Sequence, residues 1–541
     1  MQVNRNAWWV SGAGVLVVLL LPLFLTDIPP LLDYPNHLAR MFVLKLLPHD
    51  PVLSQMYEAK WRILPNIGMD FLIPPLLEFL PLEIASKLFV MLALVLPTLG
   101  TVILHRSLFR GRSYWPLSMA LVAYNTIFML GFLNFLVGIG LALLAGAIWY
   151  RQREQGLLQK RILFGSIFAL IIFFCHLIAC AFFGLLLLSI EVGAARLVYQ
   201  GGNLSPRRQL KMAFAILLPF ILPFVLYLSA PIVYEAGQGV GISQSFYNNI
   251  MHFRPLHKMN AILSVFMNYS LPLDLAVTLF LCLTLVILYV KKHLAISPYL
   301  VFAVVVLAVS FPFIPFRIKE TSFVDYRLPM FAICLVFAGT EPKNMSRKAL
   351  QLIVGAIGFV FLVRLVVIGM AWNVRNADLA ALRRVIAPIE QGRSVIVVET
   401  RDEEQHGFLD KLKGHAWRVT SRFLSNGRTT FRHLPALIVI ERKAFIPLLF
   451  THPWKQPLQV RPAYRDRADY DGFSRSIDDL STINPRVLAK APYLRNWQGK
   501  YDYLLVLLPM RDPEGVASLL EWGELLESSD IAALYRIRHG S

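Results

Sequence analysis

Side chains able to do acid–base chemistry follow the first apolar stretch of the chain, residues 8–25. Asp33, His37 and Arg40 fall within eight consecutive residues, in the sequence DYPNHLAR. Charged groups this close to a bilayer are costly to hold, which makes them functional candidates by default. A carboxylate can accept a proton from an incoming hydroxyl group, so we expect Asp33 and His37 to be catalytic and Arg40 to bind substrate. The alternative is the start of a membrane-surface helix whose long side chains reach into water.

A second set of polar side chains falls in segments that the chain can bring to the same side of a membrane. Arg and Lys can hold phosphate oxygens, and Arg does so with two parallel hydrogen bonds. We therefore expect a substrate-binding group made by His176, Arg317, Lys319, Asp325, Arg327 and Arg364.

Several of these residues have a structural alternative. His176 could cap a helix or bond to a carbonyl in a turn, and Arg327 could anchor a helix at the membrane surface. Arg364 lies inside the last apolar stretch, where an unpaired guanidinium is expensive. It could pair with Asp325 or Glu320.

Composition places the chain among polytopic membrane proteins, because 56% of its 541 residues are hydrophobic and only 16% are charged. A spanning helix needs about 20 mostly apolar residues. About eleven stretches are candidates: 8–25, 84–104, 115–130, 133–150, 162–175, 177–198, 212–230, 271–290, 298–315, 327–340 and 350–371.

Most of the formal net charge of +19 lies in short loops between these stretches. Basic groups recur in every second loop, within residues 106–112, 151–161, 207–211, 291–292 and 343–348. Cytoplasmic loops carry an excess of Lys and Arg, so we expect a cytoplasmic N-terminus and, with an odd number of spans, a C-terminus outside. The charge therefore needs no nucleic-acid partner to explain it.

This orientation gives the outer side a long first loop, residues 26–83, and the C-terminal third of the chain. Residues 36–47 and 71–80 are expected to form interfacial helices. The C-terminal third contains runs typical of buried strands at 394–399, 436–441, 502–509 and 533–537, with helices expected over 379–388 and 513–528. We predict a polytopic α-helical membrane domain, residues 1–372, and a small extracytoplasmic α/β domain, residues 373–541.

No motif assigns chemistry to the C-terminal domain, which has neither a Gly-rich phosphate loop nor a nucleophile elbow. Its histidines His406, His415 and His433 show no metal-ligand spacing. The four cysteines all fall in apolar stretches and indicate no disulfide framework. We predict no metal site. A divalent cation is compatible with the chemistry, but no ligand set is evident, so the cofactor is left unknown.

The arrangement resembles the GT-C class of membrane glycosyltransferases, which have many spans, a long first outer loop with an essential acid, and often an extracytoplasmic C-terminal domain. The resemblance implies that Asp33 occupies the catalytic-acid position. It also implies that Arg327, in DYRLP at 325–329, is similar to basic residues that meet lipid phosphate. The resemblance further implies a sugar donor carried on a polyprenyl phosphate or diphosphate and an acceptor reached from the outer side. It also implies inversion of configuration at the sugar carbon. Tyr34 follows Asp33 where the protein mannosyltransferases and aminoarabinose transferases have an Asp-Glu pair, which leaves the subfamily open.

The leading hypothesis is an integral membrane glycosyltransferase of the bacterial inner membrane. Asp33 would be the general base, His37 would orient it or hold donor phosphate, and the cations would stabilise the leaving polyprenyl phosphate. A transporter or lipid flippase is the first alternative, although the paired halves with broken helices that many transporters show are not evident. A non-catalytic membrane assembly factor for polysaccharide or secretion is the second. The sugar, the acceptor and the oligomeric state stay open.

Overall fold

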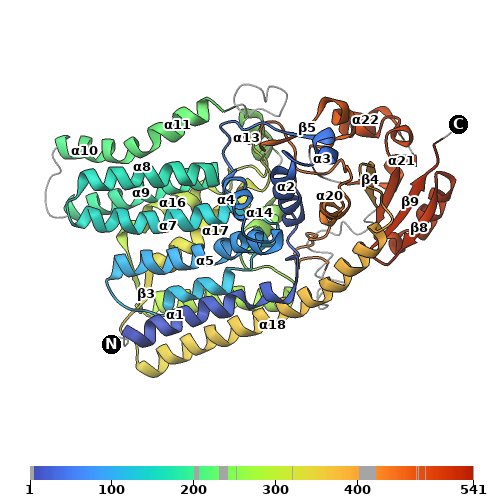
Figure 1. The fold of residues 1–541 in the computed structure, drawn as a ribbon. Helices are drawn as coiled ribbons and strands as arrows, with labels where there is room; N and C mark the ends of the chain where they lie inside the picture. Colours follow the sequence, from blue (N-terminus) through green and yellow to red (C-terminus); the bar gives the residue numbers. More distant parts are fainter. Residues whose placement is uncertain are drawn as a thin grey trace.

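The computed structural model describes residues 5–199, 206–230, 242–251, 253–319, 321–400, 422–470, 472, 474–481 and 483–539. Long helices form a bundle at one end of the molecule, and the C-terminal part of the chain forms the other end. The N-terminus lies at the far end of the bundle from the C-terminal part (Figure 1).

Seven helices in the described ranges are long and apolar enough to cross a membrane. They are α1 (Arg5–Leu20, extended by η1, Leu21–Leu25), α5 (Leu82–Phe109), α7 (Leu133–Glu154), α8 (Leu158–Cys175), α9 (Leu177–Tyr199), α15 (Leu271–Val290) and α18 (Arg347–Ile386). Shorter apolar helices accompany them: α10 (Pro206–Leu217), η3 (Leu218–Phe220), α11 (Ile221–Leu228), α16 (Pro298–Ser310) and α17 (Val324–Gly339). The protein is thus a polytopic helical membrane protein, as the composition predicts.

The candidate span at 115–130 is not one helix. It consists of the 3-10 helix η2 (Trp115–Val122) and the short helix α6 (Thr126–Met129). The break between them lies at Asn125, whose side chain accepts a hydrogen bond from the Phe128 N–H and so starts a new helix. The sequence-based prediction of a single helix here was wrong because apolar content alone does not show a cap within the stretch.

Small residues let the central helices approach closely. A Cβ on Gly140 of α7 would lie 2.4 Å from Leu96 Cβ of α5, and a Cβ on Gly138 would lie 2.8 Å from Ala179 Cβ of α9. A Cβ on Gly146 would meet Leu186 of α9 at 2.5 Å. These contacts are the close packing that small residues permit between membrane helices.

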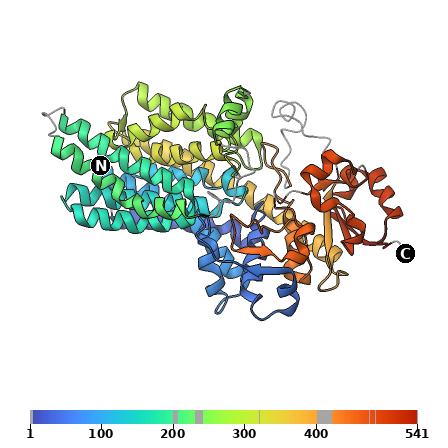
Figure 2. The same ribbon diagram turned by 90° about the horizontal axis from the view of Figure 1, so that it is seen from above.

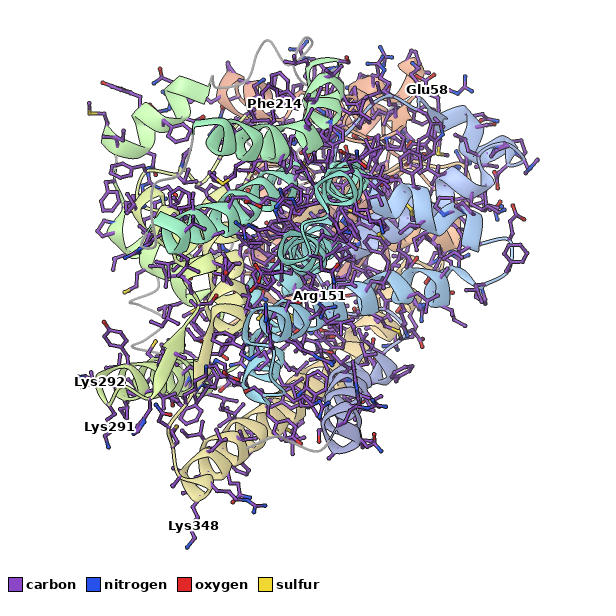
Figure 3. The ribbon with its side chains drawn as sticks, turned by 90° about the vertical axis from the view of Figure 1, so that its left-hand side faces the viewer. Glu58, Arg151, Phe214, Lys291, Lys292 and Lys348 are labelled. Carbon is purple, nitrogen blue, oxygen red and sulfur yellow. The ribbon has the colours of Figure 1, made fainter. Side chains whose placement is uncertain are left out.

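Basic side chains gather at the end of the bundle opposite the C-terminal part. Figure 3 looks onto this end and labels Arg151, Lys291, Lys292 and Lys348 there. Arg110 joins them, because its Nη2 lies 2.9 Å from Oε2 of Glu154, at the end of α7. Loops that are separate in the sequence therefore share one end, as the alternation of basic loops predicts.

At the other end, the first long loop folds into α2 (Tyr34–Leu46), α3 (Pro51–Met56), β1 (Tyr57–Ala59) and α4 (Gly68–Leu76). The helices expected at 36–47 and 71–80 are therefore present, the second displaced towards the N-terminus. Strand β1 pairs antiparallel with β5 (Leu458–Val460), so the first loop and the C-terminal part share a small sheet. Figure 2 shows the segment around β5 lying against the first-loop elements. Helices α13 (Ile242–Met251) and α14 (Pro255–Leu263) lie nearby. Strand β2 (Leu294–Ile296) pairs antiparallel with β3 (Thr340–Pro342) at the opposite end of the bundle, where Figure 1 shows β3 near the N-terminus.

The C-terminal part holds a five-stranded mixed sheet in the order β6-β4-β7-β9-β8. Strands β4 (Val395–Glu399), β7 (Tyr503–Leu507) and β9 (Ala532–Ile537) match three predicted strands. The edge strands are β6 (Arg475–Ser476) and β8 (Gly523–Ser528). This part also contains short helices: η4 (Leu434–Ala436), α20 (Leu437–Arg442), η5 (Pro462–Arg467), α21 (Ile477–Ser481), α22 (Pro485–Lys490), η6 (Pro492–Leu494), η7 (Trp497–Gly499), η8 (Pro509–Arg511), α23 (Pro513–Ser518) and η9 (Leu519–Glu521).

Two predictions for this part were wrong, and a third was right only in part. Residues 436–441 form helix α20, which packs against α2, rather than a strand. A short apolar run cannot separate a buried strand from a buried helical turn. Residues 513–528 contain strand β8 after a short helix. The helix expected over 379–388 is present as far as Ile386, but it is the end of α18, which runs unbroken through residues 372 and 373.

Candidate active site

Asp33 is held at the start of α2 by the turn that follows α6. The Leu32 and Asp33 N–H groups donate to the carbonyl oxygens of Met129 (2.9 Å) and Leu130 (3.2 Å). Gly131 completes the turn at φ +83°, where a Cβ would lie 2.9 Å from Asp33 Cβ and 3.0 Å from its nitrogen. Only glycine fits both the backbone angle and the close approach. The Asp33 side chain remains 16% exposed, so it can meet a substrate.

The side chain facing Asp33 comes from the C-terminal part of the chain. His433 Nδ1 lies 3.2 Å from Asp33 Oδ1, an ion-pair distance whose angle is not that of a straight hydrogen bond. The imidazole is buried, and its Nε2 lies 2.8 Å from the carbonyl oxygen of Gly472. Sequence analysis assigned His433 no role, because nothing near residue 433 links it to residue 33.

His37, expected to be catalytic, lies one helical turn beyond Asp33, and its backbone N–H donates to the Asp33 carbonyl oxygen at 3.0 Å. Its half-buried ring packs edge-on against Phe450, which also packs edge-on against His433. Burial, followed by the nearby charges of Arg40 and His433, lowers the pKa of His37 well below its usual value. His37 is therefore neutral near pH 7, and the ion-pair contact with Asp33 is made by His433.

Arg40, expected to bind substrate, is engaged within the protein. Its Nε and Nη2 lie 2.7 and 2.9 Å from the two carboxylate oxygens of Asp70 in α4. Both side chains are almost fully buried. This is the bidentate geometry in which Arg binds carboxylates most strongly.

Arg327 is brought to the site by α17. Its guanidinium carbon lies 4.7 Å from the Phe132 ring centroid and 5.5 Å from that of Phe135, and Nη1 donates to the Ser322 carbonyl at 2.6 Å. Within the described part of the chain, its Nε has no hydrogen-bond partner. The guanidinium is near enough to Asp33 for the two charges to interact. Arg327 is thus a buried cation near the Asp33 carboxylate, and its Nε–H is available to donate a hydrogen bond.

His176 lies in the break between α8 and α9, and the charge of Arg327 reaches it. Its Nδ1 accepts a hydrogen bond from the Ile178 N–H at 3.1 Å, and its ring packs edge-on against Phe135. The local capping that was one alternative for His176 is therefore present, and the residue also lies next to Arg327.

Asp325, two residues before Arg327, has its own cations. His257 Nε2 and Lys258 Nζ from α14 lie 3.0 and 2.9 Å from its Oδ2. Arg317 and Lys319 lie in the preceding loop, where Arg317 Nε donates to the Lys319 carbonyl oxygen at 3.0 Å and the Arg317 side chain is exposed. These two residues lie on the surface next to α17 rather than in the buried cluster.

Arg364 pairs with Asp274, not with Asp325 as one alternative had it; the other alternative, Glu320, lies outside the described residues. The Arg364 Nη1 lies 2.9 Å from Asp274 Oδ1, and its Nη2 donates to the Phe266 carbonyl oxygen at 2.7 Å. Asp274 also accepts from the Asn268 N–H at 2.8 Å and from Ser425 Oγ at 2.7 Å. The cluster therefore joins two membrane helices to the C-terminal part.

Arg428 is another cation that sequence analysis missed. Its guanidinium carbon lies 4.8 Å from the ring centroid of Phe323 and 5.9 Å from that of Tyr326, the residue before Arg327. The Phe323 ring in turn packs edge-on against Phe132, on which Arg327 lies. No acidic partner of Arg428 occurs in the described ranges.

As for metals, no group of three or more His, Cys, Asp or Glu side chains in those same ranges could hold an ion.

No protein-family model and no curated protein matches the sequence. Solved structures are similar in fold. The structure of ArnT from Cupriavidus metallidurans bound to undecaprenyl phosphate aligns with a TM-score of 0.50 at 11% identity, covering 98% of each chain. Its apo state gives a TM-score of 0.49 at the same identity and coverage. The chain therefore shares its overall fold with the undecaprenyl phosphate-bound ArnT structure over almost its whole length, which confirms the polytopic helical membrane fold expected from the sequence.

Proposed function

We propose that the protein is an integral membrane glycosyltransferase that moves a sugar from a polyprenyl-phosphate-linked donor to an acceptor on the outer side of the membrane. The observation that carries the proposal is a partly exposed carboxylate, Asp33, placed by a rigid turn beside a buried cation, Arg327. A fold shared with a protein whose structure holds undecaprenyl phosphate supports the donor class. The gathering of basic loops at the other end supports a cytoplasmic N-terminus, and we propose a bacterial inner membrane as the location.

In this reaction Asp33 is the general base. The acceptor hydroxyl gives its proton to the Asp33 carboxylate while its oxygen forms the new bond to the anomeric carbon of the sugar. The bond from that carbon to the phosphate oxygen breaks, and its electron pair leaves with the polyprenyl phosphate. Arg327 and Arg428 lie where they can stabilise the negative charge that grows on this phosphate.

The other predicted site residues have different roles in this proposal. We propose that Arg40 and Arg364 act indirectly, because their guanidinium groups are already paired with Asp70 and Asp274. We propose that His176 supports Arg327, and that Asp325 fixes the start of α17 through Lys258. Arg317 and Lys319 keep their proposed role in binding a lipid phosphate at the membrane surface, because they lie in the loop before α17 and the Arg317 side chain is exposed.

The test compares Asp33→Asn with Asp27→Asn in membranes supplied with a panel of polyprenyl-phosphate-linked sugars. Asp27 is a matched control because it belongs to the same loop and its side chain is 75% exposed. We expect Asp33→Asn to lower sugar transfer by about 100-fold or more, and Asp27→Asn to leave it near the wild-type rate. Wild-type turnover by Asp33→Asn would remove Asp33 from the mechanism. Vectorial lipid movement without sugar transfer, measured in liposomes, would favour a flippase instead.

A further inference from the structure

The segment from Arg422 to His433, called the strap here, is anchored in the membrane domain at its centre. The Ser425 N–H donates a hydrogen bond to the carbonyl oxygen of Asn268 at 2.7 Å, and Ser425 Oγ donates to Asp274 of α15. Asn426 Nδ2 donates to Thr126 Oγ1 at 2.9 Å. The strap therefore has a fixed path across the outer end of the bundle, and His433 ends that path beside Asp33.

The seat of the His433 ring determines which of its nitrogens carries a proton. A carbonyl oxygen only accepts hydrogen bonds, so Nε2, at 2.8 Å from the Gly472 carbonyl, must be the protonated nitrogen. The other nitrogen, Nδ1, then faces Asp33 Oδ1 at 3.2 Å. A bare lone pair there would repel the carboxylate, whereas an N–H would attract it. The contact is therefore favourable with an N–H on Nδ1 facing the Asp33 carboxylate.

The surroundings of His433 hold the ring in this orientation. Phe450 packs edge-on against it, with ring centroids 5.2 Å apart. Gly472, at φ +73°, allows the backbone to pass Phe450, because a Cβ there would lie 2.9 Å from that ring. His37 also packs edge-on against Phe450 and is close enough to His433 for its pKa to be affected by that residue. The His433 ring is therefore fixed in a buried position by its packing against Phe450 and by its contact with the Gly472 carbonyl oxygen.

We infer that His433 is a positioning residue for Asp33, supplied to the active site by the C-terminal part of the chain. This inference rests on the proposed glycosyltransferase function. In this role the N–H on His433 Nδ1 holds Oδ1 of Asp33, which leaves Oδ2 to take the acceptor proton. The acceptor proton moves to Oδ2, the acceptor oxygen bonds to the sugar, and the electron pair of the broken bond leaves on the lipid phosphate. The C-terminal part is then a component of the reaction site rather than a separate docking module.

Two neutral variants of His433 separate positioning from simple support of the fold. Asn places its amide nitrogen near the position of Nδ1, so His433→Asn keeps a donor towards Asp33. Gln places its amide nitrogen near Nε2, so His433→Gln keeps only the contact towards Gly472. We expect His433→Gln to lower kcat by on the order of 10- to 100-fold with KM for the donor little changed, and His433→Asn to recover much of that loss. His49→Gln, on an exposed histidine after α2, serves as the control and should behave as wild type.

A double-mutant comparison measures whether the two residues act as a unit. In an Asp33→Asn background, His433→Gln should lower the residual transfer by less than threefold. Wild-type kcat in His433→Gln, equal losses in the Asn and Gln variants, or a full additional loss in the Asp33→Asn background would overturn the role of His433 while leaving the proposed function intact. An absence of sugar transfer by the wild-type protein with every donor would instead overturn the proposed function and this role with it.

Discussion

Arg40 and Asp70 form a two-bonded ion pair in which both side chains are almost completely removed from solvent. The pair joins α2 to α4, and α2 is the helix that begins directly after Asp33. Arg40, which was expected to bind substrate, therefore fixes helix α2, and the N-terminus of α2 positions the Asp33 carboxylate. A buried guanidinium of this kind is stable only with its partner in place.

Removing the Asp70 carboxylate should destabilise the protein strongly. Asp70→Ala leaves the Arg40 guanidinium buried and uncompensated, which costs about 3–5 kcal/mol in comparable buried pairs. We expect a clearly lower melting temperature for the purified protein in nanodiscs. Glu78→Gln is the control, since Glu78 pairs with Lys45 at the surface and should not change the melting temperature measurably. Equal melting temperatures for wild type and Asp70→Ala would contradict this role.

Gly131→Ala should displace Asp33. The added Cβ would lie within about 3 Å of the Asp33 backbone and Cβ, at a backbone angle that alanine rarely adopts. We expect the rate of sugar transfer to fall on the order of 100-fold, because the base moves away from the acceptor. Gly156→Ala is the matched control: its φ is +71° but no atom lies within 4 Å of the added Cβ. Similar rates in the two variants would show that the turn does not place Asp33.

Ser425→Ala should weaken the strap without unfolding the protein. The substitution removes one hydrogen bond to Asp274, worth about 1 kcal/mol, while the bond from the Ser425 N–H remains. We expect a several-fold loss of transfer with a small change in melting temperature. The loss should disappear when Ser425→Ala is made in a His433→Gln background, since the strap then no longer carries a functional imidazole. Ser481→Ala, at an exposed serine of the same part of the chain, should have no effect.

Acidification should destabilise the fold through His37. Its pKa is lowered by burial and by the neighbouring charges of Arg40 and His433, so the folded protein keeps it neutral. In the unfolded chain the ring takes up a proton near its ordinary pKa of about 6.5. As the pH falls below that value, the unfolded state binds a proton that the folded state rejects, and the stability decreases. The drop in melting temperature from about pH 7.5 to about pH 5.5 should be smaller for His37→Gln than for wild type; an identical drop would contradict the burial of a neutral His37.

The sequence alone determined the features that depend on local composition. Long apolar runs predict the spans because a helix satisfies its own backbone in lipid, whatever surrounds it. The basic loops predict a common end, and the stretch after the first span points to Asp33. Local composition also predicts the three strands β4, β7 and β9. Each is a continuous β-branched or apolar run bounded by polar residues.

Only the tertiary structure decided which charged groups meet. Arg40 finds Asp70 in the same loop, Arg364 finds Asp274 on another helix, and Asp33 finds His433 from the far end of the chain. The run at 436–441 becomes helix α20 because it packs against α2, a partner that no local pattern reveals. An ion pair or a packed face has no periodicity in the sequence, because its two halves are selected by the path of the backbone through space rather than by neighbouring residues.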